Sequence, residues 1–222
     1  PIPLRIECTI PGVDIYFTVD PYDGTGALVR GQSDSIGTMC ALVCNKRVVA
    51  TCVGDVNSQE LYYYRPGSDK THRLRLRSQR AKPMVIDPEQ TLLSQRLLLR
   101  SMLHERSDIV QRMVYGQLFK DHGIANGSIG ISMAQLWKGE VGGAIMAHPG
   151  STPWDTSPVI GLSLRLGFEF FRLVPGRSLI RRFDPVPPKH TEQEGYEILV
   201  LHRSRLDEFT TWCAAQDIAL IR

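Results

Sequence analysis

Three strand-like segments in a row, joined by short turns, constrain the fold of this chain more than any other feature. They cover residues 38–45, 47–55 and 60–67 and read "TMCALVCN", "RVVATCVGD" and "ELYYYRPG". β-Branched and aromatic side chains of this kind are typical of strands. Asn45-Lys46 makes a tight turn between the first two segments, and residues 55–59 make a longer one. Because such short turns join antiparallel neighbours, the sequence predicts hairpins in an antiparallel sheet.

The rest of the chain mixes the two kinds of element. Helices are predicted at 88–106, 127–139, 154–167 and 204–216, and strands at 13–19, 144–146, 168–173 and 196–202. Asp155 and Ser204 are expected to cap the last two helices, with Glu208 close to capping-box spacing. The proline-rich stretch 175–195 is expected to be a connection. Hairpins among helices indicate an α+β fold rather than a strict βαβ alternation.

Composition narrows the class of protein. A hydrophobic content of 42% in 222 residues is enough for a real core, and a net charge of +3 is too small to indicate a nucleic-acid polymer as partner. Two basic clusters, 72–82 and 177–182, favour a solvated face or loop. No apolar run reaches the roughly 18 residues of a membrane span. Five cysteines without a CxxC pair suggest reduced thiols in a cytoplasmic protein.

The stretch "VDPYDGTGALV" (19–29) carries the clearest chemical signal. Asp20 and Asp23 follow a strand, and a turn there can place both carboxylates on one side, where a cation would relieve their repulsion. Hard oxygen ligands suit Mg²⁺. Residues 24–26, Gly-Thr-Gly, offer backbone N–H groups that could hold phosphate oxygens. The same residues also suit an ordinary turn stabilised by an aspartate side chain, so this stretch alone leaves both readings open.

Further segments, in a fixed order, accompany this stretch. They are the hairpin "RVVATCVGDVNSQELYYYRPG", the segment "GSIGISMAQLWKGEVGGAIM" (127–146) and a distant "PWDTSP" (153–158). Together with "DPYDGT" (20–25), they resemble the inositol monophosphatase-like superfamily of Mg²⁺-dependent phosphatases over residues 13 to about 202. The resemblance implies a layered α/β/α/β/α sandwich of the sugar and inositol phosphatase type. It also implies one phosphatase unit over 1–222, with a metal- and phosphate-binding half (1–115) and a C-terminal half that carries the Trp-Asp motif (116–222).

The resemblance also implies a role for each matched residue. Asp20, Asp23 and the Tyr22 backbone carbonyl would be metal ligands, and Asp155 would supply a third carboxylate besides capping its helix. Gly24 and Thr25 would hold the phosphate through backbone N–H groups, and the Thr25 hydroxyl would orient the attacking water. Two or more Mg²⁺ ions would be bound. Gly127 and Ser128 would lie at the substrate edge of the site.

Several departures from the family pattern leave questions open. The family's bridging glutamate has only Glu7 as a counterpart, and Glu7 could equally be an exposed strand residue. The family's N-terminal pair of helices has no counterpart, so we expect an N-terminally shortened form. Inositol-specific members carry an acid shortly before Trp-Asp, where this chain has "IMAHPGSTP". His148 in that stretch could touch a substrate or be polar surface.

The expected function is therefore a Mg²⁺-dependent phosphomonoesterase for a small phosphorylated metabolite, in a cytoplasmic homodimer. One alternative is a phosphatase of the same fold that acts on a 3′-phosphonucleotide, on fructose bisphosphate or on histidinol phosphate. A second alternative, from another class, is a degenerate member that binds a phosphorylated ligand without catalysis.

Overall fold

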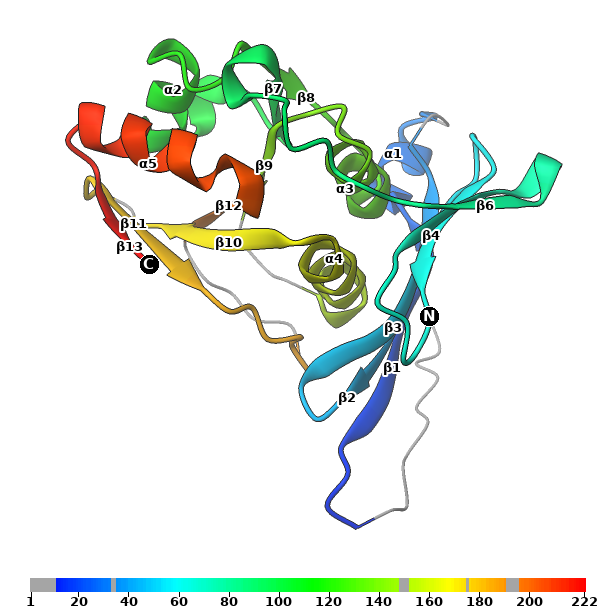
Figure 1. Ribbon diagram of the computed structural model, residues 1–222. Helices are drawn as coiled ribbons and strands as arrows, with labels where there is room; N and C mark the ends of the chain where they lie inside the picture. The colour runs from blue at the N-terminus through cyan, green and yellow to red at the C-terminus, as the bar shows by residue number, and fades with distance from the viewer. Residues whose placement is uncertain (1–10, 33–34, 148–151, 175, 191–195) are drawn as a thin grey trace.

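The computed structural model describes residues 11–32, 35–147, 152–174, 176–190 and 196–222. These residues form two β-sheets with a pair of helices between them and a second pair on the far side of one sheet (Figure 1). The α+β class and the layered arrangement predicted from the sequence are confirmed.

The first sheet is a six-stranded antiparallel meander in chain order. Its strands are β1 (Ile15–Asp23), β2 (Gly37–Cys44), β3 (Arg47–Asp55), β4 (Glu60–Tyr64), β5 (His72–Arg75) and β6 (Arg80–Pro83). Asn45 and Lys46 both adopt positive φ angles of 49° and 63°, as a two-residue hairpin between right-handed twisted strands requires. The predicted central hairpins are thus confirmed.

The second sheet has seven strands in the order β13-β11-β10-β12-β9-β7-β8. Its strands are β7 (Arg96–Leu99), β8 (Asp121–Ile124), β9 (Gly143–Ala147), β10 (Phe168–Leu173), β11 (Leu179–Phe183), β12 (Glu197–His202) and β13 (Ala219–Ile221). The stretch 175–195 therefore contains a strand, β11, which the proline-rich sequence obscured. β11 pairs with β10 on one side and with β13 on the other.

Five α-helices and four short 3₁₀ turns complete the described residues. The helices are α1 (Thr25–Val29), α2 (Asp108–Tyr115), α3 (Ile129–Trp137), α4 (Pro153–Leu166) and α5 (Leu206–Ala215). The turns are η1 (Leu76–Ser78), η2 (Leu92–Ser94), η3 (Leu103–Glu105) and η4 (Arg203–Arg205). Among the described residues, no helix combines the length and apolar character needed to cross a membrane.

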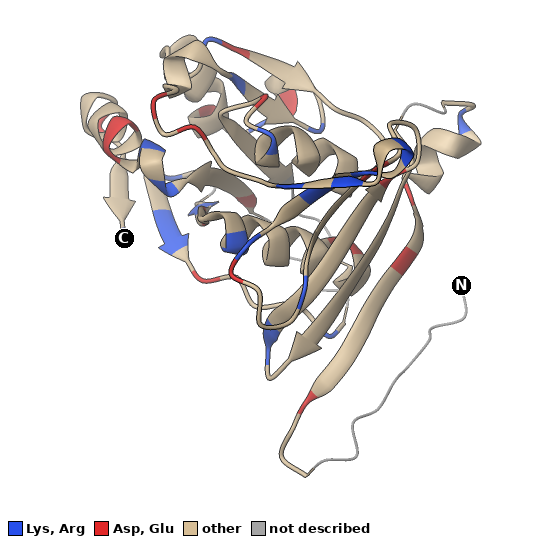
Figure 2. Ribbon diagram, turned by 45° about the vertical axis from the view of Figure 1, so that its right-hand side comes forward, with Lys and Arg blue, Asp and Glu red and all other residues tan. Residues whose placement is uncertain are grey.

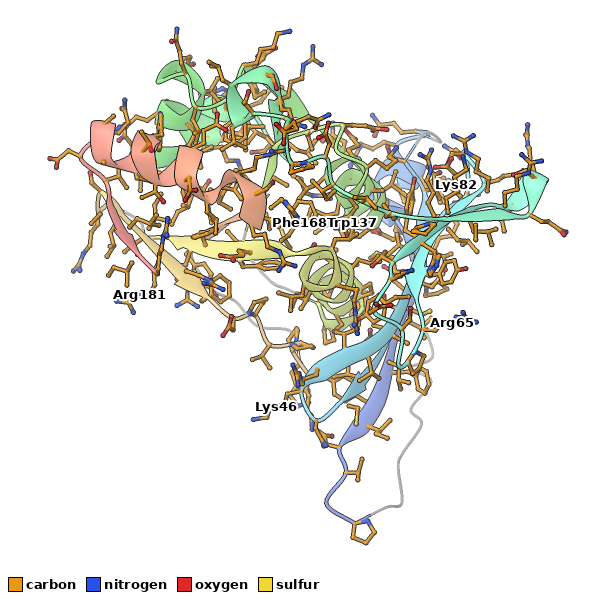
Figure 3. All side chains as sticks on the ribbon, in the orientation of Figure 1. Lys46, Arg65, Lys82, Trp137, Phe168 and Arg181 are labelled. Carbon is orange, nitrogen blue, oxygen red and sulfur yellow. The ribbon has the colours of Figure 1, made fainter. Side chains whose placement is uncertain are left out.

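Two hydrophobic cores hold these layers together. The first lies between the sheets, where residues of α3 and α4 pack against both, and Figure 3 shows Trp137 and Phe168 in this interior. The Trp137 indole donates a hydrogen bond of 2.9 Å to the Ser163 hydroxyl, which satisfies its buried N–H. The second core lies under α2 and α5 on the outer face of the second sheet. The layers are fixed mainly by burial of these apolar faces.

The prediction of a helix at 88–106 is wrong. Leu97, Leu98 and Leu99 form strand β7, which pairs in parallel with β8 and β9 and is buried on both faces. A strand buried on both faces has a continuous run of apolar residues, so the leucines lack the alternation of a half-exposed strand. Such a run looks like part of a helix in the sequence alone.

Two predicted helix caps are also corrected. Thr152, not Asp155, is the N-cap of α4, and Asp155 lies in the first turn. Ser204 lies in η4 and not at the start of α5. The Glu208 carboxylate accepts hydrogen bonds from the backbone N–H groups of Leu92 (2.8 Å) and Leu93 (3.2 Å), and so caps η2 instead. The predicted stop of α3 is confirmed, because Gly139 adopts φ 74° directly after the C-cap.

Candidate metal and phosphate site

Three carboxylates from distant parts of the chain meet at one end of the first sheet. One side-chain oxygen from each of Asp20, Asp23 and Asp155 lies within 4.8 Å of the other two. Asp20 and Asp23 come from the end of β1, and Asp155 from the first turn of α4. Carboxylate oxygens at this spacing could together hold a hard divalent cation.

An irregularity in β1 explains how Asp20 and Asp23 can both face this point. Residues three apart in a regular strand point to opposite faces of the sheet. The pairing of β1 with β2 shifts register between Asp20 and Asp23. The Asp20 carboxylate also accepts a hydrogen bond of 2.9 Å from the backbone N–H of Tyr22. A bulge of this kind re-aims side chains, which here brings two acids of one strand together.

Asp23 is bound to the N-terminus of α3. Its carboxylate accepts hydrogen bonds from the backbone N–H groups of Ile129 (3.2 Å) and Gly130 (2.9 Å) and from the Ser128 hydroxyl. Only 5% of Asp23 is exposed. Burial raises the pKa of Asp23, while the three hydrogen bonds act in the opposite direction. Donors at a helix N-terminus stabilise an ionised carboxylate, so α3 helps to keep this buried acid charged.

Asp155 is the acid whose ionisation the site opposes most clearly. Burial, together with the nearby Asp23 and Asp20, raises the pKa of Asp155 to about 6, and the hydrogen bond from the Thr152 hydroxyl opposes this shift. A partly buried carboxyl beside two like charges favours the neutral form unless a cation is present. The cluster therefore has the electrostatics expected of a cation site.

Gly24 and Thr25 form the start of α1, beside the acids. Gly24 adopts a left-handed conformation (φ 98°), and a Cβ there would lie 2.5 Å from the Ser35 carbonyl oxygen and 2.9 Å from the Ser128 nitrogen. No side chain fits at this position. The Thr25 hydroxyl donates a hydrogen bond of 2.9 Å to the Tyr22 carbonyl. The first backbone N–H groups of a helix have no partner within it, which makes this turn suitable for an anion.

Gly127 and Ser128 lie directly against Asp23 and Gly24. Ser128 is the N-cap of α3, and its hydroxyl both accepts from the Ile131 N–H (3.0 Å) and donates to Asp23. Gly127 has φ +83°, and a Cβ there would meet Ser35 at 2.6–2.7 Å. Both residues therefore support the positions of Asp23 and Gly24.

Arg100 is a residue of this site that the sequence did not reveal. Its guanidinium donates to the carbonyl of Gly127 (2.8 Å), the carbonyl of Ser128 (3.3 Å) and the hydroxyl of Ser132 (2.9 Å). Burial lowers the pKa of Arg100, and the charges of Asp23 and Asp155 act against that shift. Arg100 directly follows strand β7, and the end of a parallel strand is a usual place for functional side chains. That signal was lost because the leucine run before it resembles a helix.

Two of the predicted site residues, Glu7 and His148, lie outside the described residues. The other predicted site residues lie at the end of β1 and at or next to the starts of α1, α3 and α4. They are Asp20, Tyr22, Asp23, Gly24, Thr25, Gly127, Ser128 and Asp155.

Comparison with known proteins adds information at the level of structure. No protein-family profile and no curated protein sequence matches the chain. Among solved structures, Mycobacterium tuberculosis SuhB is 15% identical with a TM-score of 0.63, and the match covers 92% of this chain and 74% of SuhB. An IMPase/NADP phosphatase complexed with Mg²⁺ and phosphate is 16% identical with a TM-score of 0.64 (95% and 69% covered). SaIMPase-II bound to inositol monophosphate is 15% identical with a TM-score of 0.65 (95% and 74% covered).

These structures share the arrangement of the chain over nearly its whole length, at an identity too low to show more than the fold. Three residues of the motifs that led to the same comparison from the sequence, Asp20, Asp23 and Asp155, meet at one point of that fold. The chain has the inositol monophosphatase fold.

Proposed function

We propose that this protein is a divalent-metal-dependent phosphomonoesterase that acts on a small phosphorylated metabolite. The observation that carries the proposal is the convergence of Asp20, Asp23 and Asp155 within 4.8 Å. Two structural neighbours support it, since one was solved with Mg²⁺ and phosphate and another with inositol monophosphate.

In this proposal Asp20, Asp23 and Asp155 hold Mg²⁺, with Glu7 and the Tyr22 carbonyl as further ligands. Bound Mg²⁺ would lower the pKa of a water ligand and neutralise charge on the phosphoryl group and the leaving oxygen. The backbone N–H groups at Gly24 and Thr25 would hold the phosphate oxygens. The Thr25 hydroxyl, which donates a hydrogen bond to the Tyr22 carbonyl, would accept a hydrogen bond from the attacking water and so orient it.

Arg100 has a positioning role in this scheme. It binds the two carbonyls of the loop at Gly127 and Ser128, and Ser128 in turn donates to Asp23. The guanidinium thereby holds the segment that aims one of the proposed ligands. His148 as a substrate contact, the homodimer and the cytoplasmic location remain predictions from the sequence.

The test is release of inorganic phosphate with and without Mg²⁺. The substrate panel contains inositol monophosphate, adenosine 3′,5′-bisphosphate, fructose 1,6-bisphosphate and histidinol phosphate. We expect Mg²⁺-dependent release from at least one of them, and a loss of at least about a hundredfold in Asp20→Asn, because a neutral amide replaces a charged ligand. Asp69→Asn is the matched control, since Asp69 is an exposed acid in the loop after β4.

Unchanged release in Asp20→Asn would contradict the proposed site. Binding of a phosphorylated compound without release in the wild-type protein would instead support the non-catalytic alternative.

A further inference from the structure

The hairpin formed by β5, η1 and β6 carries a dense cluster of positive charge. Residues 72–83 read "HRLRLRSQRAKP" and contain four arginines, one lysine and one histidine, with no acid. We call this segment the basic hairpin. It extends from the edge of the first sheet, as Figure 1 shows, and Figure 2 colours its arginines and lysine.

The strand register places four of these cations on one face of the hairpin. Arg73 lies directly opposite Lys82, and Arg75 lies directly opposite Arg80. Residues two apart in a strand point to the same face, so both pairs share it. Like charges directly opposite each other destabilise a two-stranded ladder. The hairpin carries two such pairs side by side.

These four side chains line a pocket. Arg73, Arg75, Arg80 and Lys82, together with Ser78, surround a cavity of about 350 Å³. This volume is at the lower end of the range for small-ligand sites, which is about 300–1,000 Å³. Figure 3 labels Lys82 on β6 at this edge of the molecule.

A buried carboxylate fixes one side of the pocket. Glu60 of β4 is 6% exposed and accepts hydrogen bonds from Arg73 (2.8 and 2.6 Å), from Arg75 (3.2 Å) and from the Tyr62 hydroxyl (2.8 Å). Arg73 is therefore held in place before any ligand arrives, which lowers the entropic cost of binding. Glu60 supplies one negative charge against the four positive charges of the pocket.

Protection of the sheet edge does not account for this arrangement. Charged residues and proline on an edge strand prevent pairing with another chain, and Arg80, Lys82 and Pro83 of β6 suit that role. Arg73 and Arg75, however, lie on the inner neighbour β5 and are bound to a buried acid. Edge protection requires neither of them. A ligand that brings negative charge would relieve the repulsion of both cross-strand pairs.

The pocket is separate from the carboxylate cluster. One row of paired residues crosses the sheet from Asp23 through Gly37, Asp55, Glu60 and Arg75 to Arg80. Strands lie about 4.8 Å apart, so the backbone of Arg75 is roughly 19 Å from that of Asp23. The two places are thus four strand spacings apart across the sheet.

We propose that the basic hairpin binds a polyphosphate chain, as found in inorganic polyphosphates and nucleoside triphosphates, at a site distinct from the carboxylate cluster. The backbone positions of the four residues span about 7 Å along the strands and about 5 Å across them. An anion with several closely spaced charges suits four cations on one face, and a guanidinium group can bind two phosphate oxygens at once. This inference goes beyond the proposed function and does not depend on it.

The experiment measures binding of inorganic tripolyphosphate to the full chain by titration calorimetry, in low salt with no divalent metal. The double variant Arg80→Gln/Lys82→Gln removes one exposed cation from each cross-strand pair. Arg177→Gln/Arg181→Gln removes the same charge from exposed positions near and on β11. We expect the hairpin variant to bind at least about tenfold more weakly than the wild type, because two charge-assisted contacts are lost, and the control to bind like the wild type.

Two results would overturn the proposal. One is equal weakening in both double variants, which would mean diffuse attraction rather than a site. The other is a single-stranded oligonucleotide that displaces tripolyphosphate and binds more tightly, which would assign the hairpin to nucleic acid. Asp20→Asn should leave the affinity for tripolyphosphate unchanged, so failure of this site can be told apart from failure of the phosphatase proposal.

Discussion

Asp155 and Asp23 are carboxylic acids whose surroundings oppose their charged forms. The pKa of both is raised chiefly by burial, and that of Asp155 reaches about 6. When the folded pKa of an acid exceeds its unfolded value, the stabilising contribution is fully present below the unfolded value. It is lost as the pH rises through the folded one. Without a cation, the folded protein should therefore lose stability between about pH 4 and pH 6 from Asp155.

The raised pKa of Asp155 predicts that cation binding depends on pH. Mg²⁺ binds the ionised carboxylates, so its affinity should increase as the pH rises from 5 to 7. Binding should release up to about one proton per protein at pH 5 and almost no protons above pH 7.5. Calorimetric titration of Mg²⁺ in two buffers of different ionisation enthalpy measures the protons released. Asp155→Asn is the matched variant and should release far fewer protons at pH 5. Affinity and proton release that do not change between pH 5 and pH 7.5 would contradict the raised pKa of Asp155.

At the scale of elements, the site depends on close contact between the start of α1, the loop around Ser35 and the start of α3. The backbone N–H of Ser128 donates a hydrogen bond of 2.9 Å to the Ser35 carbonyl. Gly24 and Gly127 lie on either side of this contact, and a Cβ on either one would meet Ser35. The two glycines are thus needed for both their positive φ angles and the space that they leave.

A pair of glycine variants separates these two requirements. Gly127→Ala should destabilise the protein by more than the roughly 1–3 kcal/mol expected for a left-handed alanine alone, because the Ser35 backbone must also move. Gly67→Ala is the control, since Gly67 has φ +73° but nothing within 4 Å of its Cβ position. Urea unfolding of both variants gives the comparison. Equal losses of stability would mean that the contact with Ser35 tolerates a methyl group.

At the scale of the whole molecule, the carboxylate cluster joins elements that are far apart in the sequence. Asp20 and Asp23 come from an outer strand of the first sheet, and Asp155 from a helix between the sheets. A cation held by all three would bind the folded chain more tightly than the unfolded one, where Asp155 is far from Asp20 and Asp23. Ligand binding of this kind stabilises the native state by mass action.

Mg²⁺ should accordingly raise the thermal midpoint of unfolding at pH 7.5. At about a hundred times the dissociation constant the expected stabilisation is roughly 2.7 kcal/mol. Differential scanning calorimetry with increasing Mg²⁺ measures the shift. Asp69→Asn should show the full shift and Asp20→Asn a much smaller one. An identical shift in Asp20→Asn would place the stabilising ion elsewhere on the protein.

Local patterns in the sequence were sufficient for much of the fold. The alternation in residues 38–64 determined the central hairpins, and Gly139 determined where α3 ends. Each of these features depends on neighbours a few residues away, so the physical cause lies within the pattern itself. The acids of the candidate site were also visible, because "DPYDGT" and "PWDTSP" are short and chemically distinctive.

Tertiary structure decided those features that depend on contacts between residues far apart in the sequence. Leu97–Leu99 became an inner strand because β8 and β9 flank it, and this placed Arg100 beside Gly127 and Ser128. The register between β5 and β6 gathered the cations of the basic hairpin on one face. The sequence by itself determined which acids and which cations the protein has. Only the packing of layers decided which of them meet, since burial and long-range pairing, rather than local preference, fix those distances.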